Sequence, residues 1–240
     1  MLSDRIQTLS PSLTIAISSL ARDLKAQGKD ILSFSAGEPD FGTPQRIKDE
    51  AIKAINDGFT QYTAVPGIPE LLEAVAAKLK KDNNLDYAPS DIIVSNGAKQ
   101  SLFNLFQAVL NEGDEVIIPA PYWFTYPELV KYASAVPIII ETDEISGFKM
   151  TAEQLSAAIT PKTKMVILTT PSNPTGSVYS KEELEALASV LKGTDIMVVS
   201  DEMYEKLVYD IDFVAAASIS EDMFQRTVTV NGLSKSVAMT

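Results

Sequence analysis

From residue 92 onward the sequence alternates between short apolar runs and amphipathic stretches. The apolar runs are rich in Val and Ile, and they fall at 92–95, 115–118, 136–140, 165–168, 196–199 and 227–230. Apolar strands that are mostly separated by helices form a largely parallel sheet, because helices then cover both of its faces. The pattern therefore predicts an α/β fold whose ligand lies beyond the carboxyl ends of the strands.

The part of the chain before residue 92 predicts three further helices and one strand. Apolar residues such as Ile17, Leu20 and Ile55 recur at helical spacing over 11–27 and 45–57, and a third helix begins near Pro69. A short run at 31–34 has strand character and leads into a turn-rich segment. Two later helices begin with capping boxes, formed by Thr151 with Gln154 and by Ser180 with Glu183.

Composition excludes several classes of function. The 240 residues carry 20 basic against 32 acidic side chains, a net charge of −12 that repels nucleic acids and anionic membranes. There is no cysteine, hence no disulfide or thiolate metal site, and we predict no metal site at all. The chain begins without an apolar signal core and has no window of roughly 20 apolar residues, so we expect a cytoplasmic protein. Histidine is absent, which leaves Lys, Tyr, Asp and Glu for proton transfer.

Residues with chemical potential follow the expected strands. After 92–95, Gly97, Ala98 and Lys99 open a helix, where free backbone N–H groups suit a phosphate, although many helices begin after a glycine. After 115–118 comes Trp123, the only tryptophan, which is either a core residue or a platform for a flat ring. After 165–168, Asn173 lies in a loop of two prolines and a glycine, as a turn residue or as an amide directed at the site.

The last two strands are followed by ionisable groups. Asp201 and Tyr204 come after 196–199, where an aspartate is often only a helix cap. Lys235 comes after 227–230 in a loop of small residues, and is either a solvated lysine or an amine nucleophile. We therefore expect five kinds of group in one region: a phosphate-binding helix start, an aromatic ring, an amide, a carboxylate with a phenol, and an amine. Together they match pyridoxal phosphate better than any other cofactor.

These residues resemble those of a known family, the fold-type I pyridoxal-phosphate aminotransferases, and within it the bacterial-type aspartate aminotransferases. The similarity extends over essentially the whole chain. Its most specific parts are Asn173-Pro174-Thr175-Gly176, Ser200-Asp201-Glu202-Met203-Tyr204 and Ser234-Lys235. The resemblance implies pyridoxal 5'-phosphate as cofactor and a ping-pong transamination.

The resemblance also implies roles for single residues. Lys235 corresponds to the lysine that forms the aldimine and moves the proton, and Asp201 to the partner of the pyridinium nitrogen. Tyr204 and Asn173 correspond to partners of the ring's phenolate oxygen, and Trp123 to the stacking aromatic. The remaining correspondences are the phosphate turn (Gly97, Ala98, Lys99), a tyrosine that reaches the phosphate of the neighbouring subunit of a homodimer (Tyr62), and the glycine near the substrate α-carboxylate (Gly37).

Substrate preference is implied by three further positions. Ser12, Thr14 and Lys99 match residues that recognise a distal carboxylate in the bacterial-type subgroup, although the default reading of Ser12 and Thr14 is a helix start. The expected reaction joins aspartate or glutamate with a 2-oxo acid such as 2-oxoglutarate. Aminotransferases that use prephenate share the pattern, and the same fold also serves lyases and racemases.

Two departures from the family pattern remain. Family members continue past Thr240 with a phosphate-binding arginine and the rest of a small domain, so we expect an incomplete enzyme, and a non-catalytic fragment is an alternative. Gly232 stands where some relatives have a phosphate-binding serine. By this resemblance, 1–44 form an N-terminal arm and part of the small domain, and 45–240 form the cofactor-binding large domain.

Overall fold

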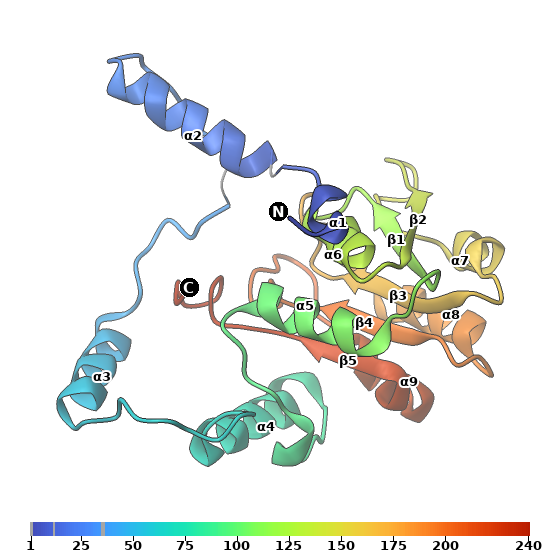
Figure 1. Cartoon of the computed structure of the whole chain (residues 1–240). Helices are drawn as coiled ribbons and strands as arrows, with labels where there is room; N and C mark the ends of the chain where they lie inside the picture. Colours follow the sequence, from blue (N-terminus) through green and yellow to red (C-terminus); the bar gives the residue numbers. More distant parts are fainter. Residues whose placement is uncertain (1, 12, 35–36) are drawn as a thin grey trace.

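The computed structural model of the chain describes residues 2–11, 13–34 and 37–240. Its centre is a five-stranded sheet in which every neighbouring pair of strands is parallel (Figure 1). The strands are β1 (Glu115–Ala120), β2 (Val136–Glu141), β3 (Thr163–Thr169), β4 (Met197–Asp201) and β5 (Thr227–Val230), in the spatial order β2-β1-β3-β4-β5. The predicted α/β fold with a parallel sheet is confirmed.

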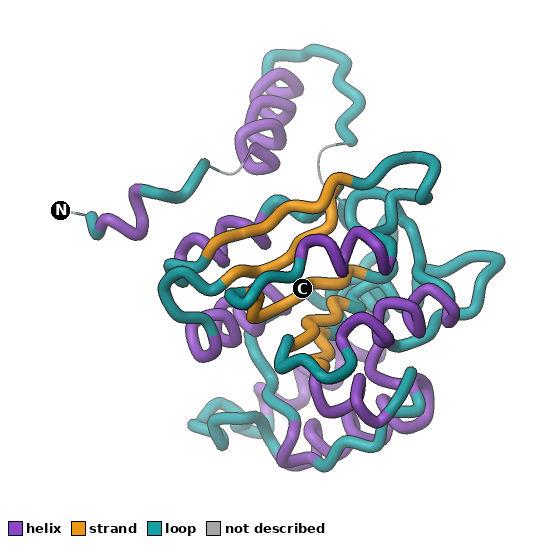
Figure 2. Tube along the Cα trace, turned by 90° about the vertical axis from the view of Figure 1, so that its right-hand side faces the viewer, coloured by secondary structure: helices purple, strands orange, loops and turns teal. Residues whose placement is uncertain are grey.

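Helices cover both faces of the sheet (Figure 2). One face packs against α5 (Ala98–Val109) and α6 (Thr125–Tyr132). The other packs against α7 (Ala152–Ala158), α8 (Lys181–Leu191) and α9 (Glu221–Arg226). Alternate residues of β3 point to opposite faces, as the pleat requires: Met165 and Ile167 join the first layer, whereas Val166 and Leu168 join the second.

Local sequence signals place the ends of two of these helices. The side chain of Thr151 accepts a hydrogen bond from the backbone N–H of Gln154, and Ser180 does the same for Glu183. The side chains of Gln154 and Glu183 bind the backbone of the capping residue in return. Both predicted capping boxes are therefore confirmed, and each satisfies helix-end donors that would otherwise lack partners.

Two predicted strands are wrong. The segment 92–95 follows a short 3-10 helix, η1 (Pro89–Asp91), and forms no ladder with another strand. Its Val94 N–H binds the carbonyl of Pro66 instead, and Ile93 is 73% exposed. The segment 31–34 is also irregular and exposed. A strand needs a neighbour that pairs with it, and in the described part of the chain neither segment has one.

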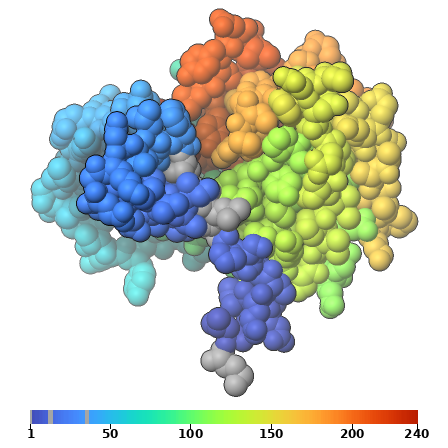
Figure 3. Space-filling view, turned by 90° about the horizontal axis from the view of Figure 1, so that it is seen from above, coloured from blue at the N-terminus to red at the C-terminus, as the bar shows by residue number. Residues whose placement is uncertain are grey.

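The segments before α5 contribute little to the core. They contain α1 (Asp4–Gln7), α2 (Leu13–Ala26), α3 (Gln45–Asn56) and α4 (Pro69–Asn83). In Figures 1 and 3, α2 and α3 lie to one side of the body built around the sheet. The helix predictions are confirmed, but Ile17, Leu20 and Ile55 remain exposed, so the described residues leave these apolar faces uncovered. No helix in the described ranges is both long and apolar enough to cross a membrane.

α4 buries apolar side chains against the body. Its Leu79 is buried against Leu85 and two alanines, Ala215 and Ala217, near the 3-10 helix η2 (Ala216–Ser218). Leu72 is buried as well, which agrees with the apolar face expected after Pro69. α4 therefore connects the N-terminal segments to the side of the sheet where β4 and β5 lie.

Candidate active site

A cavity of about 940 Å³ lies at the carboxyl ends of the strands. Parallel strands end at one edge of a sheet, so the loops that follow them converge there. The cavity is lined by Gly37, Gly97, Ala98, Lys99, Trp123, Asn173, Asp201, Tyr204, Ser234 and Lys235, among other residues. Most of the residues singled out from the sequence are therefore neighbours, including Gly37, which comes from the distant N-terminal segment.

Lys235 lies in a turn just after β5, and its amine is directed into the cavity. Its Nζ donates a hydrogen bond to the carbonyl oxygen of Gly37 at 2.6 Å. The same nitrogen lies 5.9 Å from the centre of the Tyr204 ring. The side chain is half-buried, so the amine is accessible from the cavity while being held by protein groups.

Asp201 is the last residue of β4 and only 4% exposed. Its Oδ2 accepts a hydrogen bond from the Tyr126 hydroxyl at 2.6 Å, and its Oδ1 accepts one from the backbone N–H of Met203 at 3.3 Å. Burial raises the pKa of the Asp201 carboxyl, and the hydrogen bond from Tyr126 opposes that shift. The carboxyl is thus fixed in position by two donors.

Tyr126 was not foreseen from the sequence. It lies in α6, is buried, and also accepts a hydrogen bond from the Thr169 hydroxyl at 2.9 Å. Its pKa lies well above the ordinary value, because the phenol is buried and faces the Asp201 carboxylate, so the hydroxyl remains a donor. The available signal was its spacing: Tyr126 follows Trp123 by three residues, and the two rings meet edge to face at 5.4 Å.

Tyr204 and Asn173 approach each other across the cavity. The Asn173 side-chain N–H group donates to the Tyr204 hydroxyl at 3.4 Å, a long hydrogen bond. Burial raises the pKa of Tyr204, the charge of Asp201 adds to the shift, and the contact with Asn173 opposes it. The phenol therefore remains protonated near neutral pH and can donate a hydrogen bond.

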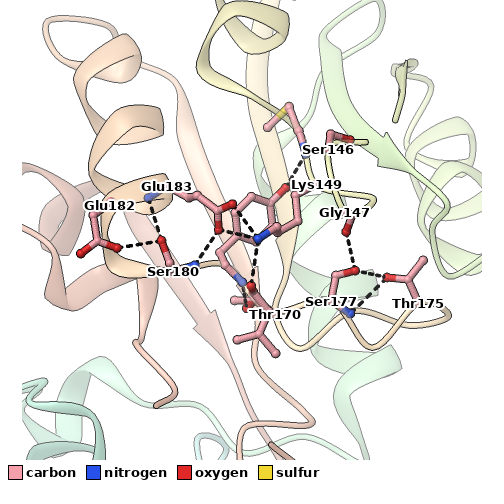
Figure 4. Close-up of polar contacts among 12 residues, drawn as sticks. Ser146, Gly147, Lys149, Thr170, Thr175, Ser177, Ser180, Glu182 and Glu183 are labelled. Atoms are coloured by element: carbon pink, nitrogen blue, oxygen red, sulfur yellow. Dashed lines mark hydrogen bonds and ion pairs between the residues drawn. The ribbon is translucent and has the colours of Figure 1, made fainter. Parts of the chain in front are cut away.

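The loop that carries Asn173 is braced from outside the cavity (Figure 4). The Ser177 hydroxyl donates to the carbonyl of Gly147 at 2.7 Å and accepts from the Thr175 hydroxyl at 3.0 Å. Nearby, Lys149 forms an ion pair with Glu183 at 2.6 Å. These contacts connect the loop after β3 to the segment before α7 and to the start of α8. They hold in place the loop that carries Asn173.

Another part of the cavity wall begins at Gly97. Its φ of +81° is a conformation that glycine adopts at low cost, and α5 starts with the next residue. The cation of Lys99 lies 5.1 Å from the centre of the Trp123 ring, over its face. This wall thus combines the N-terminal end of a twelve-residue helix, an ammonium group and an aromatic plate.

A side chain at position 232 would lie close to Met203. A side-chain carbon added at this position would lie 2.9 Å from the sulfur of Met203, which is closer than packed atoms tolerate. The serine of some relatives would therefore require Met203 to move.

Three residues singled out from the sequence are not placed in the cavity. Tyr62 is fully exposed and does not line it. Ser12 lies outside the described residues. Thr14 belongs to the first turn of α2, but the position of its side chain is also outside what the structure describes.

Comparison with known proteins agrees with this arrangement. The family model described as "Aminotransferase class I and II" matches residues 29–240. The chain belongs to that family. An aspartate aminotransferase of Bacillus sp. (strain YM-2) is 52% identical over 241 residues, and an aspartate/prephenate aminotransferase of Nitrosomonas europaea is 50% identical over 241 residues. Among solved structures, the aspartate aminotransferase of Thermus thermophilus with maleate is 45% identical, with a TM-score of 0.96.

The family members are longer than this chain. All of its residues are covered in the three comparisons, but it spans only 61–62% of the length of each of these relatives. The family and the fold follow from the comparisons. The activity, substrates and partners of the whole protein are inferred below.

Proposed function

We propose that this chain belongs to an enzyme that transaminates a dicarboxylic amino acid, aspartate or glutamate, with a 2-oxo acid such as 2-oxoglutarate, using pyridoxal 5'-phosphate. The observation that carries the proposal is the arrangement around one cavity of an amine, a buried carboxylate and a phenol. Lys235, Asp201 and Tyr204 supply them. The family to which the chain belongs supports the proposal.

The residues present fit this cofactor. Asp201 is buried, yet it forms no ion pair with a lysine or arginine within the described ranges. A buried carboxylate without a cation is costly, and a protonated ring nitrogen of the cofactor would supply the missing charge. The start of α5 would take the phosphate, because its backbone N–H groups and Lys99 favour an anion.

When bound, pyridoxal phosphate supplies an aldehyde that takes up amino groups and a ring that accepts electrons, so the two substrates react in turn in a ping-pong scheme. Lys235 would hold the cofactor through its amine, and the free amine would move the proton at the substrate α-carbon. Asp201 would pair with a protonated ring nitrogen, and Tyr126 holds the Asp201 carboxylate in place. Tyr204 and Asn173 would donate hydrogen bonds to the ring oxygen, and Trp123 would pack on the ring.

A dicarboxylic substrate is supported by charge and by the relatives. Lys99 places a cation on the cavity wall, where it can pair with a distal carboxylate. Ser12 and Thr14 are proposed to assist it. The named relatives act on aspartate, and the Thermus structure was obtained with maleate, itself a dicarboxylate. Prephenate is a second candidate acceptor, because relatives of equal similarity are named for it.

The family resemblance also suggests a domain organisation. Residues 1–44 are proposed as the arm and part of the small domain, and 45–240 as the large domain. Gly37 then brings the substrate α-carboxylate close to Lys235, with which it already shares a hydrogen bond. Exposed Tyr62 is proposed to reach the phosphate of the other subunit of a homodimer. A cytoplasmic setting suits these small-molecule substrates.

The test is an assay of the full-length natural protein, with any residues that its gene encodes beyond this chain. We expect pyridoxal phosphate to bind, and aspartate with 2-oxoglutarate to give oxaloacetate and glutamate. Lys235→Ala serves as the inactive control. Turnover of dicarboxylic amino acids that is absent, or no faster than that of alanine or an aromatic amino acid, contradicts the proposal. Replacing 2-oxoglutarate with prephenate decides between the two acceptors.

A further inference from the structure

The turn after β4 directs its side chains in two directions. Asp201, Met203 and Tyr204 line the cavity. Glu202 and Glu205 are buried and do not line it. Two acidic side chains buried behind a site have to be held by other groups, since burial of a carboxylate without partners costs free energy.

Glu205 is held by α4 through a closed set of contacts. Its Oε1 pairs with the ammonium group of Lys78, and its Oε2 accepts a hydrogen bond from the side-chain N–H group of Asn83 at 2.7 Å. Lys78 also donates to the side-chain oxygen of Asn83 at 2.7 Å. Glu205 is 6% exposed and Asn83 is buried too. Each of the three side chains therefore contacts the other two.

The backbone of the turn transmits the position of Glu205 to Tyr204. The N–H of Glu205 binds the carbonyl of Glu202 at 3.1 Å, and the N–H of Leu207 binds the carbonyl of Tyr204 at 2.7 Å. Glu202 is fixed in turn, because its Oε1 accepts hydrogen bonds from the Ser200 hydroxyl and the Ala216 N–H. Tyr204 thus lies between Glu202 and Glu205, both of which are held by hydrogen bonds.

We propose that Glu205, gripped by Lys78 and Asn83, is a positioning residue that sets the place of the Tyr204 phenol in the cavity. No residue of α4 lines the cavity, and the contacts with Glu205 give the helix a link to a turn that does. The importance of Tyr204 for catalysis rests on the proposed function, but the mechanical link does not. The link can therefore be tested in protein that contains no cofactor.

The test follows the titration of Tyr204 by NMR in full-length natural protein labelled at the tyrosine ring carbon that bears the hydroxyl. Tyr204→Phe identifies the signal. Burial is the largest cause that raises the pKa of Tyr204. If Glu205→Ala releases the turn, the phenol meets more water and its pKa falls toward the ordinary value.

Glu205→Gln separates position from charge. Both substitutions remove the negative charge, but glutamine retains a side-chain oxygen that can accept from Asn83. We expect a clearly smaller fall in the pKa of Tyr204 for Gln than for Ala. Equal falls would mean that only the charge of Glu205 matters, and no change in either variant would also overturn the proposal. If the Ala variant does not fold, Glu205→Asp, whose shorter side chain loosens the same contacts while keeping the charge, takes its place and must still lower the pKa.

The chain contains a matched control. Lys206 pairs with Asp82 at 2.8 Å, which joins the same helix to the same turn, but this pair is more exposed to solvent. Asp82→Asn should leave the titration of Tyr204 unchanged, because exposed ion pairs contribute little. A shift as large as that of Glu205→Ala would contradict a specific role of Glu205. Failure of the protein to bind pyridoxal phosphate would contradict the proposed function but not this link.

Discussion

Asp201 and Glu202 are neighbours in the sequence, yet their carboxyl groups face different surroundings. Asp201 faces the cavity and accepts from Tyr126 and Met203. Glu202 is completely buried behind it, and its Oε2 has no hydrogen-bond partner among the described residues. Burial raises the pKa of Glu202 to about 7, so this carboxyl carries a proton well above the pH at which a glutamate usually ionises. Burial raises the pKa of both adjacent acids, but only Asp201 lines the cavity.

Glu202→Gln should change the dependence of stability on pH. Because the pKa of Glu202 is raised in the folded state, its protonated form is favoured there. The contribution of Glu202 to stability is therefore fully present below pH 4.5 and is lost as the pH rises through about 7. Glutamine stays neutral and removes this loss. Urea unfolding at pH 5 and pH 8 should show a loss smaller in the variant than in the wild type, by on the order of 2 to 3 kcal/mol. An identical loss in both proteins would show that Glu202 titrates normally.

Lys99→Ala tests the preference for a dicarboxylic substrate. A carboxylate brought out of water requires a paired cation, so the substitution should lower kcat/KM for aspartate and glutamate by roughly 10- to 100-fold. Alanine has no distal carboxylate and provides the internal control. Steady-state kinetics with both substrates measure the difference. Equal losses would mean that Lys99 serves the cofactor phosphate or the fold instead.

At the residue scale, the sequence predicted which side chains lie at the strand ends. It missed the side chains of other elements that hold them in place. Lys235, Asp201 and Asn173 could be placed because parallel strands end at one edge. The contact between Tyr126 and Asp201 joins a helix to a strand 75 residues away, and no local pattern encodes it. The contact between Lys78 of α4 and Glu205 joins residues that are 127 positions apart, and it was missed for the same reason.

At the scale of elements, the loop between β3 and α8 is held by contacts outside the cavity. Ser177 forms two of the hydrogen bonds shown in Figure 4, to Gly147 and Thr175. The sequence predicted an irregular loop from its prolines and glycine, but it could not specify which segment would hold it. The partner lies before α7, where nothing in the sequence marks a contact.

Ser177→Ala should lower the free energy of unfolding by about 1 kcal/mol, because a half-buried carbonyl of Gly147 loses its donor. Urea denaturation measures this change. Ser189→Ala is the matched control: its hydroxyl donates to the carbonyl of Glu185 within the exposed face of α8, so its loss should cost close to nothing. Equal destabilisation by both substitutions would contradict the bracing of the loop.

The wrong strand predictions also belong to this scale. The residues at 92–95 have the composition of a strand, but composition does not create a partner, and β5 pairs only with β4 in the described part of the chain. Intrinsic strand preference is weak beside the requirement for pairing. Helices were predicted more reliably, since each satisfies its hydrogen bonds within one segment.

At the scale of the whole molecule, the apolar faces of α2 and α3 are the most unusual feature. Ile17 and Leu20 on α2, and Ile52 and Ile55 on α3, are exposed, as is Phe59 just after α3. Exposed apolar helix faces of this kind favour association with another surface. Among the described residues, β5 is an edge strand of the sheet, and an edge strand offers its outer backbone groups to another chain.

Residues 1–240 purified by themselves should therefore self-associate and lack ordinary transaminase turnover. Light scattering measures the association, and the assay with aspartate and 2-oxoglutarate measures the turnover. Replacing Ile17 and Leu20 by serine should reduce the association, whereas the exposed substitution Ser189→Ala should not. A homogeneous dimer with ordinary turnover would contradict this expectation.

Lys235 is proposed to hold the cofactor. The most direct measurement is borohydride reduction of the full-length natural protein loaded with pyridoxal phosphate, which fixes the cofactor to the amine that carries it, followed by peptide mapping. The account predicts the label on Lys235 and its loss in Lys235→Ala. A label on another lysine, such as Lys99, which also lines the cavity, would contradict the account.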